Sequence, residues 1–225
     1  MTLPPFHPFS LDYTADPKPY FAEFHRSGRL VVVEVEHALT GGVGEFEVED
    51  VGASVGVLSR ARSVEEVLER LVDAVAELAE VDRVMAYRFL PDGTGEVVAE
   101  RHVSGLEPYL GLRYPASDIP PQARALYRRQ LVRVTPSVDA VPVPLEALAG
   151  ADAEPLDLSL AHLRAVSPVH LAYLRNMGVR GTLVLSLLVD DALWGLVSAH
   201  SHSRPLVVPR PTRRACELLA RRSGR

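Results

Sequence analysis

Tyr114-Pro115-Ala116-Ser117-Asp118-Ile119-Pro120 is the most informative segment of this chain of 225 residues. The residues that follow it predict a helix from Ile119 to Gln130, with prolines in the first turn. Asp118 is the candidate N-cap of this helix, because an aspartate there can accept hydrogen bonds from the first free backbone N–H groups. On its own, this capping role would be enough to explain Asp118.

Upstream of this segment, the sequence predicts a helix and then a hairpin. Apolar residues recur at spacings of three and four between 63 and 79, which is typical of one buried helix face. Ser63 and Glu66 form a capping-box pattern at its start. Residues 83–89 and 95–101 predict paired strands, with Pro91-Asp92-Gly93 as the turn between them.

Downstream, residues 135–155 form a Pro- and Ala-rich loop, which at this length indicates a functional or mobile segment. One or two helical pieces are expected within 158–177. Strands at 182–189 and 193–200 then form a second hairpin around Asp190-Asp191, and a helix follows at 212–222. This order predicts an α+β fold, a central antiparallel sheet flanked by helices.

The first forty residues differ from the rest. Residues 9–25 and 29–36 predict two strands, with Arg26-Ser27-Gly28-Arg29 as the turn. Two strands alone do not form a stable domain, so they must pack against something else or be left over from a larger unit. The glycine-rich stretch 41–56 is interpreted as a linker. Its Gly41-Gly42-Val43-Gly44 lacks the preceding strand and following helix of a phosphate-binding loop.

Composition excludes several classes of function. The net charge of −5 and the lack of a basic stripe with aromatics argue against binding to nucleic acid. No apolar run reaches the length of a membrane span, and MTLPPFHPFS lacks a signal-peptide pattern, so we expect a soluble, cytoplasmic protein. The single cysteine, Cys216, excludes an internal disulfide and a Cys-rich metal site. His200-Ser201-His202 suggests no third metal ligand, and no arrangement of residues indicates an enzyme.

Several motifs together resemble the bacterial phytochromes. Residues 114–120 resemble the PASDIP motif of phytochrome GAF domains. Residues 82–89, 164–178 and 193–200 are similar to the family's first GAF strand, the helix over its chromophore and its last strand, in the same order and spacing. Residues 20–36 are similar to the closing strands of the phytochrome PAS domain. The resemblance implies a partial PAS domain at 1–40, a linker at 41–62 and a GAF domain at 63–225.

The resemblance also implies a bound linear tetrapyrrole, biliverdin or a related bilin. In the family's pattern, Asp118 and His170 lie near the pyrrole nitrogens, and His200 lies near the D-ring carbonyl. The remaining implied contacts are Tyr87, Tyr114 and Tyr173 around the D-ring, Arg133 and Arg164 on the propionates, Ser167 close to the chromophore, and Ile119 and Thr182 in the pocket. This chemistry suits the ligand, because a bilin is a long apolar π-system with two carboxylates that guanidinium groups can hold.

The chain departs from the family at its attachment site. Bacterial phytochromes use a cysteine upstream of the PAS core, and plant and cyanobacterial members use one at the position of Val169, so neither usual cysteine is present. Where members often have two small hydroxyl residues beside a propionate, this chain has Thr182 and Val184. Most of the PAS domain, the PHY domain and the histidine kinase are also missing, so the chain is expected to be a fragment or a reduced relative.

These observations leave two hypotheses. In the first, the chain binds a bilin non-covalently and passes red or far-red light signals to a partner or a missing output module, with a homodimer as a candidate assembly. In the second, it is a degenerate, pigment-free GAF domain that acts in protein interaction or dimerisation.

Overall fold

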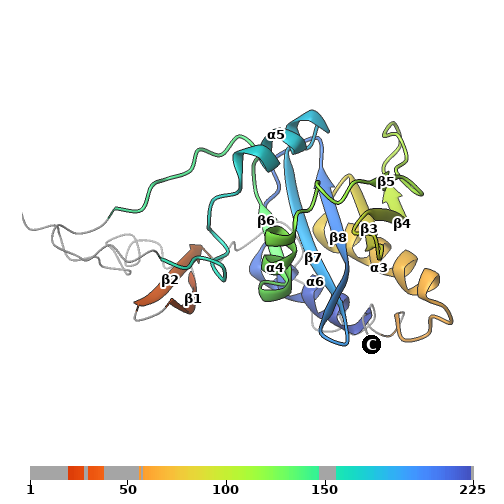
Figure 1. Cartoon of the computed structure of the whole chain (residues 1–225), viewed down its shortest axis with the longest axis horizontal. Coiled ribbons are helices and arrows are strands. Elements are labelled where there is room, and N and C mark those ends of the chain that lie inside the picture. Colours follow the sequence, from red (N-terminus) through yellow and green to blue (C-terminus); the bar gives the residue numbers. More distant parts are fainter. Residues whose placement is uncertain (1–19, 28–29, 38–55, 57, 147–155, 224–225) are drawn as a thin grey trace, which may run out of the picture.

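A computed structural model describes residues 20–27, 30–37, 56, 58–146 and 156–223 (Figure 1). Its main sheet has the strand order β5-β4-β3-β8-β7-β6, and every neighbouring pair is antiparallel. The strands are β3 (Arg83–Phe89), β4 (Gly95–His102), β5 (Arg113–Tyr114), β6 (Val132–Thr135), β7 (Gly181–Val189) and β8 (Ala192–Ser201). The helices are α3 (Val64–Ala79), α4 (Pro121–Arg129), α5 (Pro168–Asn176) and α6 (Arg210–Ser223). The predicted α+β fold with a central antiparallel sheet is confirmed.

The sheet has helices on both faces (Figure 1). α3 and α6 pack together behind it, and the main apolar core lies between them and the strands. Side chains alternate between the two faces of a strand. In β7, Leu183 and Leu185 belong to this core, whereas Thr182 and Val184 point to the opposite side, where α4 and α5 lie. Side chains of β3 and β8 alternate in the same way. Those on one face pack in the main core, and those on the other face are available to line a site.

α3 begins as the sequence predicts. The Ser63 hydroxyl accepts a hydrogen bond from the Glu66 backbone N–H at 3.2 Å. The Glu66 carboxylate reaches back to the backbone N–H of Arg62, at 2.7 Å. Two backbone N–H groups at the start of the helix are thereby satisfied.

Replacing Ser63 with alanine should lower the free energy of unfolding by about 1 kcal/mol, because one helix N–H loses its acceptor. Ser63→Asp should retain most of the stability, since aspartate is also a good N-cap. Urea unfolding followed by circular dichroism measures both variants. Equal losses in the two would contradict the capping role.

The predicted N-cap of α4 is wrong. α4 begins at Pro121 and its N-cap is Pro120, with no side-chain capping bond. A residue that precedes a proline is disfavoured in helical conformation, and here Ile119 and Pro120 both precede one. The helix therefore starts too late for Asp118 to cap it, and the aspartate is available for other contacts. Of the pieces expected within 158–177, α5 is the helix that the structure contains.

The first strands form a separate antiparallel hairpin of β1 (Tyr20–Ser27) and β2 (Leu30–His37). The predicted strand residues 9–19 and the linker 41–55 lie outside the described residues. The hairpin is fixed to α6 by ion pairs: Arg213 binds the Glu36 carboxylate with distances of 2.8 and 2.7 Å, and Arg210 lies 3.0 Å from Glu23. Of the two alternatives that the sequence left open, packing against the rest of the chain is the one that these contacts illustrate.

Among the described helices, none has the length and apolar character needed to cross a membrane.

Candidate functional site

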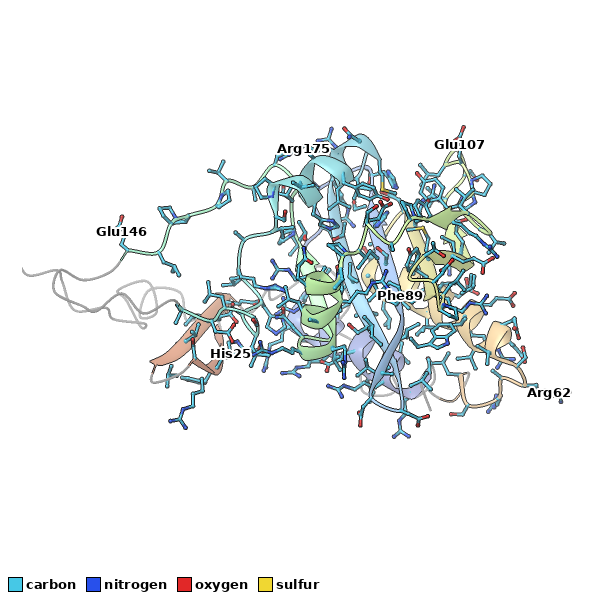
Figure 2. All side chains as sticks on the ribbon, viewed as in Figure 1. His25, Arg62, Phe89, Glu107, Glu146 and Arg175 are labelled. Atoms are coloured by element: carbon cyan, nitrogen blue, oxygen red, sulfur yellow. The ribbon has the colours of Figure 1, made fainter. Side chains whose placement is uncertain are left out.

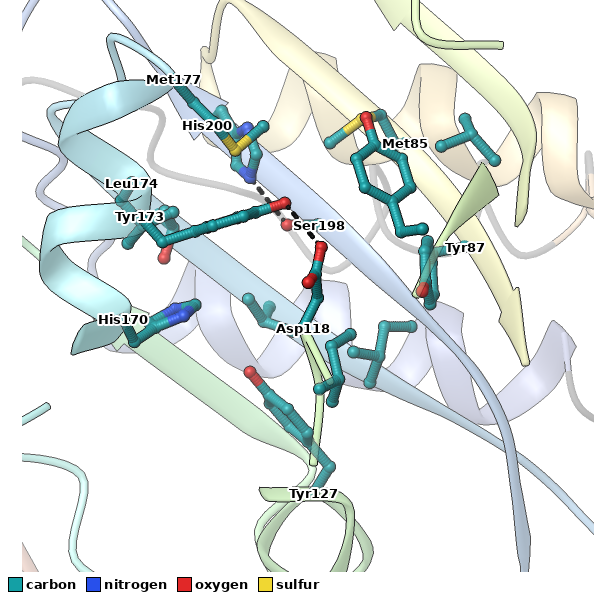
Figure 3. A pocket seen from close by; sticks show the side chains of 16 residues that line it. Met85, Tyr87, Asp118, Tyr127, His170, Tyr173, Leu174, Met177, Ser198 and His200 are labelled. Atoms are coloured by element: carbon teal, nitrogen blue, oxygen red, sulfur yellow. Dashed lines mark hydrogen bonds between the residues drawn. The ribbon is translucent and has the colours of Figure 1, made fainter. Parts of the chain in front are cut away.

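A cavity of about 100 Å³ lies between the sheet and helices α4 and α5 (Figure 3). The strands contribute the side chains that point to the face of the sheet opposite the main core. The segment before α4 supplies Tyr114, Asp118 and Ile119. The full lining is Met85, Tyr87, Val97, Tyr114, Asp118, Ile119, Tyr127, His170, Tyr173, Leu174, Met177, Thr182, Val184, Leu196, Ser198 and His200.

Asp118 and three tyrosines form the polar part of this wall. The Tyr173 hydroxyl donates to Asp118 Oδ2 at 3.4 Å (Figure 3). Burial, followed by the neighbouring Asp118 carboxylate, raises the pKa of Tyr173 well above its usual value. Burial also raises the pKa of Tyr87 and Tyr114, so all three stay as neutral donors at neutral pH. The buried Tyr87 hydroxyl has no hydrogen-bond partner among the described residues.

Two histidines complete this cavity. Burial lowers the pKa of His200 to about 3, with smaller effects from His202 and Arg83. Its Nε2 lies 2.9 Å from the Ser198 hydroxyl, while its buried Nδ1 has no partner within the described part of the chain. His170 stacks on Tyr173 with 6.4 Å between ring centroids, and burial lowers its pKa too. Both imidazoles are therefore neutral at pH 7. His170 can offer a ligand one donor and one acceptor nitrogen, whereas His200 offers its Nδ1, because its Nε2 already contacts the Ser198 hydroxyl.

A second cavity of about 340 Å³ adjoins the first. The two share Asp118, Ile119, Tyr127, His170, Thr182 and Val184 as lining residues. The second cavity is also lined by Arg133, Arg164 and Ser167. Together the cavities form one slot, with uncharged tyrosines and histidines among apolar side chains at one end and arginines at the other. Such a slot fits an elongated apolar ligand that carries carboxylates, and the unpaired Tyr87 and His200 atoms are consistent with polar groups on it.

The two arginines of the second cavity are engaged differently. Arg133 is buried and donates to the backbone carbonyls of His162, at 2.6 Å, and of Ala161 and Arg164. Burial, followed by the charge of Arg164, lowers the pKa of Arg133 to about 10, so it stays cationic at neutral pH. No hydrogen bond or ion pair from the Arg164 side chain occurs within the described ranges. Arg164 is therefore the guanidinium that is ready to take a carboxylate.

Every residue that the sequence nominated lines one or both cavities. Sequence reasoning missed several others, namely Met85, Val97, Tyr127, Leu174, Met177, Leu196 and Ser198, and it named Val184 only as a departure from the family. Strand alternation could have found Met85 beside Tyr87, and Leu196 and Ser198 beside His200, because residues two apart share a face. Helical spacing could likewise have found Leu174 from His170. Val97 of β4 and Tyr127 of α4 lie on elements without a nominated residue, so shared faces would not have found them.

Cys216 lies away from this slot. It is fully buried in the core between α6 and the sheet, on the face opposite the cavities. Burial raises the pKa of its thiol to about 12, so the reactive thiolate is scarce at neutral pH. Val169, at the family's other attachment position, is 80% exposed. Among the described residues, no group of three His, Cys, Asp or Glu side chains could hold a metal ion.

Comparison with known proteins identifies the family. The model of the GAF domain matches residues 63–222. The chain also superposes with a TM-score of 0.87 and 39% identity on the wild-type chromophore-binding domain of Stigmatella aurantiaca phytochrome P1, covering 92% of this chain and 69% of that one. This chain belongs to the GAF domain family and, within it, to the bacteriophytochromes.

Curated relatives agree with this assignment. A bacteriophytochrome of Xanthomonas campestris is 48% identical over 147 residues, which is 65% of this chain and 23% of the relative. Cyanobacterial phytochrome B of Nostoc is 38% identical over 198 residues, which is 87% of this chain and 26% of the relative. The chain thus spans about a quarter of the length of these phytochromes.

Proposed function

We propose that this bacteriophytochrome chain is a light-sensing module that holds a linear tetrapyrrole in the slot formed by the two cavities. The observation that carries the proposal is the composition of the slot. Neutral histidines and tyrosines lie at one end, and an arginine without a partner in the described chain lies at the other. A bilin supplies a light-absorbing π-system whose terminal ring can isomerise. The chain's own residues would bind it, orient it and exclude water.

Each residue has a distinct part in this proposal. Arg164, with Arg133 behind it, would hold the propionates by charge-assisted hydrogen bonds. His170 and the segment at Asp118 would face the pyrrole nitrogens. Ser167, Ile119 and Thr182 would pack along the slot between the two ends.

The terminal ring would lie among Tyr87, Tyr114, Tyr173 and His200. The Tyr173–Asp118 hydrogen bond, at 3.4 Å, is long, and a ring rotating beside it would exchange this contact for another at a small free-energy cost. Asp118 leads directly into α4. The change in the Asp118 contact would thereby pass through α4 to the outer surface. There it would reach a signalling partner, an output module or a second copy of the chain.

Binding is proposed to be non-covalent. The sequence contains a single cysteine, Cys216. Its thiol is buried on the face of the sheet opposite the two cavities, and its pKa is raised. Retention of the pigment would then depend on apolar contact and on the arginines. We infer that biliverdin or a close relative is the pigment, since it combines an extended π-system with two carboxylates.

Coexpression with a heme oxygenase, followed by a visible spectrum before and after red light, tests the proposal. We expect an absorption band in the red or near-infrared that changes on illumination. A denaturing gel stained for zinc–bilin fluorescence should be dark, because the pigment leaves the unfolded chain. Absence of the band would reject the light-sensing function, and a fluorescent band on the gel would reject non-covalent binding.

A pigment-free interaction module is the second candidate. It is favoured by Arg133, whose guanidinium is already occupied by backbone carbonyls, and by the lack of a suitable cysteine. In that case the purified chain would be colourless after coexpression, and would still form a dimer or a complex in sedimentation experiments. A coloured monomer would exclude this candidate.

A further inference from the structure

The hairpin β1–β2 presents an unusual polar face to the rest of the chain. Glu23 and Glu34 lie directly opposite each other in the antiparallel register, and both are largely buried. Like charges at opposed positions destabilise an isolated pair of strands. Two buried carboxylates therefore require partners, and most of these lie outside the hairpin.

Glu23 finds its partners mostly on α6. Its carboxylate lies 3.0 Å from Arg210 Nε, 3.3 Å from Arg214 and 3.0 Å from the ring of His162. Glu36, two residues beyond Glu34 on the same strand, pairs with Arg213 of α6. These contacts attach the hairpin to the protein without touching the ligand slot.

Glu34 instead holds the segment that leads to α5. Its carboxylate accepts the backbone N–H groups of His162, at 2.9 Å, and of Leu163, at 2.6 Å. His25 lies 2.6 Å away on the neighbouring strand, and Figure 2 labels this histidine on the hairpin. Burial alone would raise the pKa of Glu34, but these hydrogen bonds outweigh it and the pKa is lowered. The carboxylate is therefore charged at neutral pH.

Arg133 holds the same segment from the other side. Its guanidinium donates to the carbonyls of Ala161, His162 and Arg164, while Glu34 accepts the N–H groups of His162 and Leu163. The Glu34 carboxylate of the hairpin and the Arg133 guanidinium of β6 thus hold neighbouring peptide groups of the segment that leads to Arg164. This leaves the backbone of Arg164 little freedom, while its side chain lines the second cavity and makes no hydrogen bond or ion pair within the described residues.

We propose that Glu34 is a positioning residue for the carboxylate-binding end of the slot, acting through Arg164. The hairpin would then contribute to ligand binding indirectly, although none of its residues lines the two cavities. This inference rests on the proposed function, since the carboxylate in question is a propionate of the bilin. A preorganised guanidinium binds better than a mobile one, because less conformational freedom is lost on binding.

The test separates positioning from general loss of structure by using two pigments. Biliverdin has free propionates, whereas biliverdin dimethyl ester has the same π-system with both carboxylates masked. Glu34→Gln should weaken binding of biliverdin by roughly tenfold, because the introduced amide nitrogen faces a backbone N–H donor. Binding of the dimethyl ester should change by less than about twofold, since it makes no ion pair with Arg164. Absorbance titration of the purified chain measures both affinities.

Glu36→Gln is the matched control, since Glu36 lies on the same strand and is also ion-paired, but to α6. It should leave the ratio of the two affinities unchanged. In the pigment-free chain, hydrogen exchange at the amides of His162 and Leu163 should accelerate in Glu34→Gln and not in Glu36→Gln.

Equal losses for the two pigments in Glu34→Gln, or unchanged exchange at these amides, would overturn the positioning role while the proposed function stands. Failure of the unaltered chain to bind either pigment would overturn the proposed function together with this extension of it.

Discussion

Replacing Glu100 with alanine should lower the free energy of unfolding by about 3–5 kcal/mol. Glu100 and Arg83 form an ion pair whose side chains are each 1% exposed. Glu100 also accepts the backbone N–H groups of Tyr109, at 2.7 Å, and of Leu110, at 2.8 Å. The variant would leave the Arg83 guanidinium charged and buried, in contact with the carbonyl of Glu107 and the ring of Tyr109 among the described residues.

A neighbouring ion pair on the same two strands provides the control. Glu96, four residues earlier on β4, pairs with Arg88 of β3, but the Arg88 side chain is 42% exposed. Glu96→Ala should therefore cost no more than about 1 kcal/mol, because water solvates the arginine that is left. Urea unfolding at pH 7 compares the two variants. A similar loss for both would mean that the Arg83–Glu100 pair is not desolvated in solution.

The double variant Arg83→Met with Glu100→Met gives a second check. Removing both charges avoids an unpaired buried ion, so the double variant should be more stable than Glu100→Ala. The loop at 103–112 should nevertheless be looser, because Tyr109, which lies under Arg83 at 3.8 Å, loses its cation. Tyr109 packs against the cluster of Met85, Tyr87 and Val97, so this looseness should reach the wall of the ligand slot.

The fold could be predicted largely from local patterns. The capped helix α3 and the hairpins around Asp92 and Asp190 follow from periodicity and turn residues, and the structure places them within about two residues. The N-cap of α4 was mispredicted because Pro120 and Pro121 were taken only as residues of the first helical turn, and their effect on the residues before them was not applied. The rule for residues that precede proline was available in the sequence and would have placed the start correctly.

The site was predicted less from pattern than from resemblance. Motif order brought Asp118, His170 and His200 to one place, and strand alternation would have added their neighbours. The different states of Arg133 and Arg164 could not be predicted, since both are arginines near the same slot. Only the folded chain shows that the carbonyls of residues 161, 162 and 164 occupy one of them.

Contacts between distant segments were also beyond the sequence. Glu34 and Leu163 lie 129 residues apart, and their hydrogen bond has no local signature. From sequence, the hairpin could be a remnant of a larger unit, because its partners are distant in the chain. They are α6 and the segment before α5, and only the tertiary fold brings them together. Its closely spaced acidic residues are explained by those partners.

Stability should fall steeply with acid because of His200. Burial lowers the pKa of this histidine to about 3 in the folded chain, whereas an unfolded histidine titrates near 6.5. The unfolded chain therefore binds a proton first as the pH falls below 6.5, and the folded state loses stability down to about pH 3. By pH 4 this one group should remove about 3 kcal/mol relative to pH 7.

The contribution of His200 to the acid sensitivity can be measured by comparing the stability of a His200 variant with that of the unaltered chain at several pH values. Other histidines and the carboxylates of Asp82 and Glu34 also have lowered pKa values, so the whole chain is acid-sensitive. Unfolding by urea at pH 7, 6, 5 and 4 should show a shallower loss in His200→Gln than in the unaltered chain. His102→Gln, at an exposed position of β4, should follow the unaltered curve. Parallel curves for His200→Gln and the unaltered chain would mean that water or a charge reaches the ring. The inner end of the slot would then be too polar for the pigment ring that we place there.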